Sequence, residues 1–276
     1  MFTLNCKGKL IIFDKPLVMG ILNVNNDSFY AASRLQNLDA ISKKVDQMIE
    51  EGADIIDIGG QSTQPGSERV SANEELKRVM PVFEMLAKNN NNILLSIDTY
   101  HSEVAKETVL AGASIVNDIS AGEMDKKMLE TVATLGVPFI AMHIKGVPET
   151  MHQSIQYENV VTNVLDFFID KISQCRNAGI VDVIIDPGFG FGKTIAHNFQ
   201  ILKSLEIFKM LGKPLMAGLS RKSTIYKTLQ IDVNDALNGT SVLNTIALLN
   251  GANILRVHDV KEAREAVTLL QAYGKA

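Results

Sequence analysis

Eight short apolar runs, spread along nearly the whole chain, each end in polar or glycine-rich residues. Most are continuous rather than alternating, which is typical of parallel strands buried on both faces. The segments between them carry apolar residues at helical spacing. Polar groups at the same end of successive strands build the active site of a (β/α)8 barrel, so the sequence predicts this α/β fold. The expected strands are 17–23, 54–59, 93–98, 114–118, 138–143, 182–186, 214–219 and 253–258.

The length of 276 residues fits either one barrel, for which ~250 is typical, or two smaller domains. The eight strand–helix units and the lack of a linker or low-complexity segment favour a single domain over 1–276. Ser71 and Glu74 have the spacing of a helix N-terminal capping box. Four glycines each close a helical stretch just before a strand, as C-cap glycines do: Gly52, Gly112, Gly179 and Gly251.

The bulk composition excludes several classes of protein. The net charge is -4 with both signs interspersed, so neither a nucleic-acid surface nor a charged tail is indicated. Residues 1–9 lack the apolar stretch of a signal peptide, and no run approaches the ~20 residues of a membrane span. Cys6 and Cys175 are too few and too distant for a disulfide framework or a zinc site. We therefore expect a cytoplasmic protein without a membrane or nucleic-acid partner.

A glycine-rich segment, Ile-Asp-Pro-Gly-Phe-Gly-Phe-Gly-Lys at 185–193, follows the sixth expected strand. A P-loop needs a glycine five residues before the Gly-Lys pair, but Pro187 stands there. The dinucleotide pattern also fails, because its third glycine comes one residue early. We expect a turn whose backbone approaches some other ligand closely.

Three polar residues, Asp98, Asn117 and Asp186, end three different strands and should meet at the barrel mouth. Buried carboxylates are costly without partners, so hydrogen bonds to a flat, donor-rich heterocycle are the expected use. The alternative is that each residue caps the following helix or locks a turn.

Basic residues supply the complementary half of the expected site. Lys222 follows the seventh strand, and Arg256 and His258 end the eighth, where barrels frequently bind phosphate. Arg256 and His258 are two apart and share a strand face. The alternative is a surface ion pair with a nearby carboxylate. The remaining histidines show no metal-ligand spacing: His101, His143, His152 and His197.

Two polar, turn-rich segments follow the first and second strands, at 23–29 and 60–67. Both are long enough to fold over the mouth, and we expect mobile lids.

Seven groups of short motifs occur along the chain: GILNV at 20–24 with DSF at 27–29, DIGG at 57–60 with Ser62-Thr63 and Pro65-Gly66, SID at 96–98, ND at 117–118, DPGFGFGK at 186–193, SRKS at 220–223 and RVHD at 256–259. With these motifs the chain resembles the dihydropteroate synthase family over about residues 18–260.

The resemblance implies a reaction, a metal and an oligomer. The pterin substrate carries a methylene diphosphate, diphosphate leaves in an SN1-like step, and the aniline nitrogen of 4-aminobenzoate attacks the methylene. Mg2+ is the implied cofactor. The family, a target of sulfonamides, forms homodimers through late helices of the barrel, and C2 dimers are the commonest oligomers. The implied catalytic residues are Lys222, Arg256 and His258.

The resemblance also assigns binding roles by matching positions. The pterin-binding positions are Asp98, Asn117, Asp186 and Lys222. The diphosphate positions are Thr63, Arg256 and His258, and the magnesium-linked position is Asn23. The 4-aminobenzoate pocket is framed by Phe29, Pro65, Phe191 and Ser223.

The chain departs from the family pattern in both expected lids. Asn25-Asn26 replaces the usual Thr-Pro, 30–33 replaces Ser-Asp-Gly-Gly, and Gln64 replaces an arginine. Two other functions stay open on the sequence alone. One is a methyltetrahydrofolate-dependent methyltransferase, which would leave the basic cluster without a use, and the other is a non-catalytic pterin-binding paralogue.

Overall fold

Eight parallel strands form the centre of the computed structural model, which describes residues 1–24, 34–61, 69–88, 93–146, 151 and 155–276. Their order is β8-β7-β6-β5-β4-β3-β10-β9, and a parallel bridge between Ile185 and Leu215 joins the two ends. The sheet is thus closed, and the predicted (β/α)8 barrel is confirmed. The strands are β3 (Leu17–Asn23), β4 (Ile55–Gly59), β5 (Leu94–Asp98), β6 (Ile115–Asp118), β7 (Phe139–Met142), β8 (Val183–Asp186), β9 (Met216–Ala217) and β10 (Ile254–Val257).

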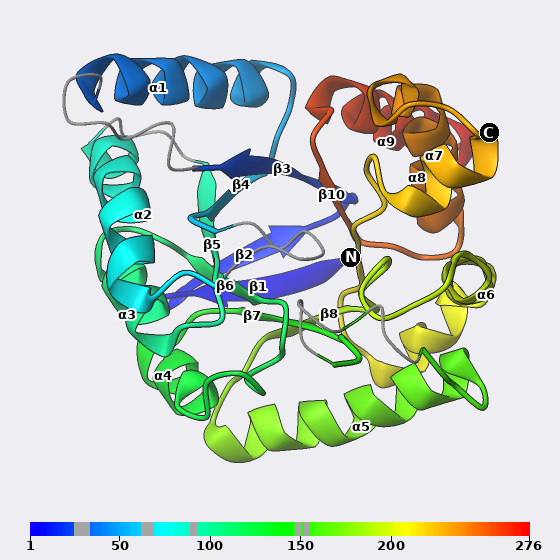
Figure 1. Ribbon diagram of the computed structural model, residues 1–276, viewed down its shortest axis with the longest axis horizontal. Coiled ribbons are helices and arrows are strands. Elements are labelled where there is room, and N and C mark those ends of the chain that lie inside the picture. The colour runs from blue at the N-terminus through cyan, green and yellow to red at the C-terminus, as the bar shows by residue number, and fades with distance from the viewer. Residues whose placement is uncertain (25–33, 62–68, 89–92, 147–150, 152–154) are drawn as a thin grey trace.

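Helices surround these strands, as Figure 1 shows. They are α1 (Arg34–Glu50), α2 (Ala72–Lys88), α3 (Ser102–Leu110), α4 (Met128–Leu135), α5 (Val160–Ala178), α6 (Ile195–Lys203), α7 (Ser223–Leu229), α8 (Leu237–Leu249) and α9 (Val260–Tyr273), with short 3-10 helices at Leu205–Leu211 and Val233–Asp235. Within the described ranges, no helix combines the length and the hydropathy that a membrane span requires.

Most of the expected strand boundaries lie within one residue of the structure, but the seventh strand is shorter than predicted. Only Met216–Ala217 is a regular strand, because Pro214 has no N–H and the Leu215 N–H donates to the Asn253 side chain at 2.9 Å. At the start of this strand, a single bridge between Leu215 and Ile185 therefore takes the place of a continuous series of paired residues.

The expected helix ends are borne out in large part. The four C-cap glycines adopt positive φ angles of 98°, 128°, 97° and 102° at Gly52, Gly112, Gly179 and Gly251. Ser71 Oγ accepts the Glu74 N–H at 3.3 Å, as an N-cap does. The Glu74 carboxylate, which a full capping box would turn back to Ser71, pairs instead with Arg78 at 3.4 Å.

Strand alternation divides the barrel interior from its surroundings. Along β4, for example, Ile55 belongs to a cluster inside the barrel, while Ile56 and Ile58 face the helices. The lower interior, which lies at the starts of the strands, is filled by one cluster of apolar side chains. Its buried members are Leu4, Cys6, Leu17, Met19, Ile55, Ile115, Ile140, Ile184, Met216 and Ile254.

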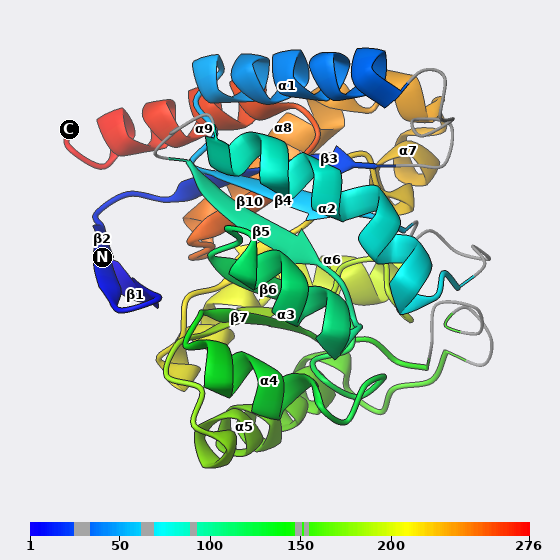
Figure 2. The same ribbon diagram turned by 90° about the vertical axis from the view of Figure 1, so that its left-hand side faces the viewer.

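A hairpin that the sequence analysis did not anticipate covers the lower end of the barrel. Strands β1 (Phe2–Cys6) and β2 (Lys9–Phe13) pair antiparallel through a two-residue turn, Lys7-Gly8, in which both φ angles are positive. Figure 2 shows the hairpin at one end of the barrel. Its side chains, including buried Leu4, pack on the interior cluster, so the hairpin completes the core.

We predict that Leu4→Ala lowers the free energy of unfolding by about 2 to 5 kcal/mol, the cost of a cavity in a packed core. Leu4 is 1% exposed, whereas Leu10 of the same hairpin is 63% exposed. Leu10→Ala is therefore the matched control and should change stability by less than about 0.5 kcal/mol. Urea titration of both variants checks the prediction, and equal stabilities would show that the hairpin does not seal the core.

Candidate active site

The upper interior of the barrel is polar because the inward positions change character near the strand ends. On four strands the residue two positions after an inward isoleucine carries an amide or a charge, so it faces the same interior. These residues are Asp57, Asn117, Asp186 and Arg256. Asp98 ends β5 beside them and completes the polar layer.

Arg256 is the centre of this layer. Its Nε donates to Asp57 Oδ2 at 2.7 Å, and its Nη2 donates to Asp98 Oδ2 at 2.6 Å. Asn117 Nδ2 donates to the same Asp57 oxygen at 2.9 Å. Residues from β4, β5, β6 and β10 thus form one network, in which the guanidinium compensates two buried carboxylates.

Asp57 is a site residue that the sequence analysis did not single out. Its position two residues after Ile55, on the same strand face, is the signal that could have identified it. The alternative of a surface ion pair for Arg256 is wrong, because Asp57 is fully buried and Asp98 nearly so.

Lys222 and Asp186 lie beside Arg256 in the mouth. Lys222 Nζ donates to the Phe189 carbonyl and lies 4.7 Å from the centre of the Phe191 ring. The place where a Cβ on Gly218 would stand is 3.7 Å from Lys222 Nζ, 3.9 Å from Asp186 Oδ2 and 4.0 Å from Arg256 Cβ, so the three side chains meet beside this glycine. Asp186 Oδ1 accepts the Gly188 N–H at 2.8 Å, so this residue also locks a turn.

The segments after β9 and β10 are tied together beside the basic cluster. Ser220 Oγ lies 3.0 Å from His258 Nδ1. Arg221 donates two hydrogen bonds to the Asp259 carboxylate, from Nε and from Nη2, each at 2.9 Å. Ser223 begins α7 directly after Lys222. The structure therefore brings His258, Lys222 and Ser223 to one rim of the barrel.

Asn23 ends β3 with an exposed side chain at the mouth. Its Oδ1 and Asp98 Oδ2 both lie within 4 Å of the place where a Cβ on Gly59 would stand. An exposed amide oxygen fits Mg2+, which prefers oxygen ligands and takes most of them from water and substrate phosphates. In the described ranges, no three His, Cys, Asp or Glu side chains are placed to hold a metal ion by themselves.

Burial shifts the pKa values of the acidic groups in the mouth. Burial raises the pKa of Asp98 to about 7, although Arg256 opposes the shift. Burial also raises the pKa of Asp186, against the charge of Lys222. Both carboxyl groups are therefore more easily protonated than exposed aspartates.

The basic groups respond to the same burial in different ways. Burial lowers the pKa of Lys222 to about 8, although Asp186 opposes it. Burial acts against the charge of Arg256 too, but Asp57 and Asp98 outweigh it and raise the arginine pKa. The surrounding protein and then Arg256 lower the pKa of His258. Arg256 is thus the permanent cation of the site.

Some predicted residues lie outside the described ranges. These are Phe29, Thr63, Pro65 and His152, together with the departures at Asn25, Asn26 and Gln64 and most of the two expected lids. The other predicted site residues meet at the barrel mouth, as the strand-end pattern predicted.

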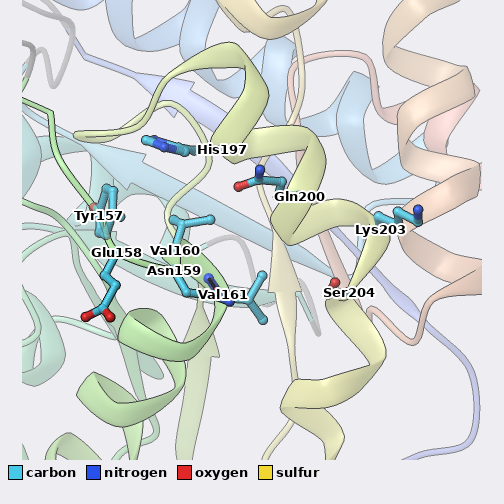
Figure 3. Close-up of a pocket in the computed structure, with 9 residues that line it drawn as sticks. All are labelled: Tyr157, Glu158, Asn159, Val160, Val161, His197, Gln200, Lys203 and Ser204. Carbon is cyan, nitrogen blue, oxygen red and sulfur yellow. Dashed lines mark hydrogen bonds between the residues drawn. The ribbon is translucent and has the colours of Figure 1, made fainter.

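A separate surface pocket lies between the start of α5 and α6 (Figure 3). It is lined by Tyr157, Glu158, Asn159, Val160, Val161, His197, Gln200, Lys203 and Ser204. The side chain of Asn159 already accepts the N–H groups of Val161 and Thr162 at the start of α5. We therefore assign no ligand to this pocket.

Comparisons with known proteins identify the class and then the family. Residues 19–258 match the family model described as "Pterin binding enzyme". Together with the barrel and its polar mouth, this match makes the chain a pterin-binding enzyme. Dihydropteroate synthase of Escherichia coli (strain K12) is 41% identical over 268 residues, or 96% of this chain and 94% of that protein. The chain belongs to the dihydropteroate synthase family.

Solved structures agree with this assignment. The Yersinia pestis dihydropteroate synthase with a sulfonamide drug complex matches with a TM-score of 0.92 at 40% identity over 100% of both chains. The Xanthomonas albilineans enzyme in complex with 7,8-dihydropteroate matches at 0.86 and 36%, over 99% of each chain. The chain is a dihydropteroate synthase, a transferase of folate biosynthesis, as its relatives are.

We predict that Asp98 makes folding stability depend on pH. Its folded-state pKa, about 7, lies above the ordinary value of 3.8, so its contribution is fully present below the unfolded pKa and is lost as pH rises through 7. The free energy of unfolding at pH 6 minus that at pH 8 should be about 1 kcal/mol larger for the wild type than for Asp98→Asn. Urea titrations at both pH values check this, and an identical difference in the two proteins would contradict it.

Proposed function

We propose that the polar layer of the mouth binds the pterin ring through Asp98, Asn117, Asp186 and Lys222. The observation that carries the proposal is the convergence of buried carboxyl and amide groups with the half-buried Lys222 above an apolar barrel floor. The ring of a dihydropterin offers several N–H donors to carboxylate oxygens and acceptors to the Asn117 amide and Lys222. Hydrogen bonds of this kind would compensate the cost of burying Asp98 and Asp186.

Arg256 and His258 bind the diphosphate at the rim, with Thr63 as a third contact by family position. Arg256 is fixed by Asp57 and Asp98 while 19% of its side chain remains exposed. A fixed cation stabilises the negative charge that develops on the leaving diphosphate without reorganising. Asn23 would hold Mg2+ through its amide oxygen. When bound, the metal supplies further charge stabilisation at the phosphate oxygens.

The 4-aminobenzoate pocket is framed by Phe191 and Ser223, with Phe29 and Pro65 by family position. The bond from the pterin methylene carbon to the diphosphate oxygen breaks, and the bond to the aniline nitrogen forms. The nitrogen, which then carries two protons and a positive charge, loses one proton to solvent water. Because the aniline is a neutral nucleophile, the residues need to orient it and stabilise charge rather than to activate it.

The experiment that tests this proposal measures diphosphate release and 7,8-dihydropteroate formation with purified protein. The expected result is product only when (7,8-dihydropterin-6-yl)methyl diphosphate, 4-aminobenzoate and Mg2+ are all present. Full turnover in the presence of a chelator would remove Mg2+ from the proposal, and binding of the pterin without turnover would remove the proposed catalytic roles.

We predict that Lys222→Ala loses most of the activity, at least about 100-fold in kcat/KM, while staying folded. The ammonium faces both Asp186 and the glycine-rich segment, and removing a buried hydrogen-bonded charge from a site costs several kcal/mol of binding. Lys227→Ala, on an exposed face of α7, is the control and should behave as the wild type. An inactive variant that is also unfolded by circular dichroism would make Lys222 structural.

We also propose that the protein is a cytoplasmic homodimer formed through α8 and its neighbours. Val242, Ile246 and Leu249 recur at helical spacing on α8 and are 49%, 36% and 55% exposed. An exposed apolar stripe of this kind is typical of an interface. The buried free thiols Cys6 and Cys175 accord with a reducing compartment.

We predict that Ile246→Glu converts the dimer into a monomer, because a charge on the apolar stripe opposes its burial. Leu110→Glu, which places the same charge on an equally apolar, exposed position of α3, should leave the dimer intact. Sedimentation velocity at micromolar concentration separates the two outcomes. A wild-type monomer would contradict the proposed assembly.

A further inference from the structure

The glycine-rich segment that failed both nucleotide motifs ends in a buried lysine. Lys193 is 4% exposed, and its Nζ lies 2.9 Å from His143 Nδ1 and 3.2 Å from the His143 carbonyl oxygen. It also donates to the carbonyls of Gly188 at 2.9 Å and Phe191 at 3.0 Å. Lys193 therefore does not face a ligand. Its ammonium is surrounded by acceptors from its own segment and from the end of β7.

Two glycines allow the segment to fold around this ammonium. Gly188 has a φ of 70°, and a Cβ there would lie 2.0 Å from the His143 carbonyl oxygen. Gly192 has a φ of 63°, and a Cβ there would lie 2.6 Å from the Lys145 carbonyl oxygen. Only glycine permits this close approach to the segment after β7. The approach directs the carbonyls of Gly188 and Phe191 toward Lys193.

The same segment contacts Lys222 from its other side. The Phe189 carbonyl accepts from Lys222 Nζ, and the Phe191 ring lies 4.7 Å from that Nζ. Residue 191 thus touches both lysines, its carbonyl bonding Lys193 and its ring lying under Lys222. Because residues 188–191 are continuous, any rotation of the peptide units released by losing Lys193 changes the position of the Phe189 carbonyl.

Hydrogen bonds stabilise the charge of Lys193, whereas its burial opposes that charge. Burial lowers the pKa of Lys193, and Lys222 adds to that effect, while Asp186 opposes it. Burial and then Lys193 lower the pKa of His143 to about 2, so the imidazole is neutral and its Nδ1 can accept. The ammonium has three protons to donate and is surrounded by four acceptors, three carbonyl oxygens and one imidazole nitrogen. These acceptors stabilise its charged form.

We propose that Lys193 is a positioning residue, which fixes the carbonyl of Phe189 and the ring of Phe191 and thereby sets the location of the Lys222 ammonium in the pterin site. Without Lys193, three buried carbonyls lose a donor, and the segment rearranges to recover hydrogen bonds. Lys222 then loses its own partner. This inference rests on the proposed role of Lys222.

The test is a double-mutant cycle on Lys193→Met and Lys222→Ala, with kcat/KM and the Kd for 7,8-dihydropteroate measured for each protein. The matched control is Lys171→Met. Lys171, on α5, is also a buried lysine, and its Nζ donates to Glu123 at 2.5 Å and to Gln174 at 2.8 Å. Within the described ranges, none of its hydrogen bonds reaches the glycine-rich segment. Urea titration reports the stability of every variant.

We expect Lys193→Met to lower kcat/KM by about 10- to 100-fold, the range for removing a partner that orients a site residue. Lys171→Met should change it by less than about twofold, although both substitutions lower stability. In the Lys222→Ala background, Lys193→Met should change the Kd for 7,8-dihydropteroate by less than about threefold, because its target is gone.

Additive losses in ligand binding for the two substitutions of the cycle would overturn the positioning role of Lys193 but leave the role of Lys222 standing. Equal losses of kcat/KM for Lys193→Met and Lys171→Met would do the same. Full activity of Lys222→Ala would overturn the role of Lys222 and this inference with it. Should Lys193→Met not fold, the same cycle is run on Lys193→Gln, whose amide keeps two donors without the charge. A loss of ligand binding in a folded Lys193→Gln that adds fully to the loss of Lys222→Ala would equally overturn the proposal.

Discussion

The site depends on one partly buried cation, the guanidinium of Arg256, held between the carboxylates of Asp57 and Asp98. Two carboxylates at the top of a closed barrel would be too costly to bury without it. Because Arg256 stands on β10 and its partners on β4 and β5, the pairing also fixes the relative position of strands from both ends of the sequence. The proposed pterin and diphosphate contacts therefore share one network.

The position of this network follows from the geometry of the strands. Inward side chains occur at every second residue, so the apolar layer at Ile55 and Ile254 places Asp57 and Arg256 one layer higher. The hairpin seals the lower layer, and the upper layer opens toward the mouth. An apolar floor under polar groups keeps water from the lower faces of the carboxyl groups, which is why burial dominates the pKa shifts of Asp98 and Asp186.

Periodicity and strand-end chemistry were enough to predict the barrel and the convergence of Asp98, Asp186 and Lys222, because both are local properties of each βα unit. The β1–β2 hairpin was missed because its short strands lie outside the βα repeat and become buried only against the closed barrel. The network around Arg256 was missed for a similar reason. Its bond to Asp57 joins residues 199 positions apart, and only the closed sheet places them together.

Lys193 and Lys222 are residues of the same type that contact the same segment, but their surroundings suit them to different roles. Both Lys193 and Lys222 are removed from bulk water, and burial lowers both pKa values. Lys193 donates to the carbonyls of Gly188 and Phe191 on one side of the glycine-rich segment, so its hydrogen-bonding capacity is used within the protein. Lys222 donates to the Phe189 carbonyl on the other side and faces Asp186, so part of its capacity remains for a ligand. The glycines between them allow one short segment to serve a structural cation and a binding cation at once.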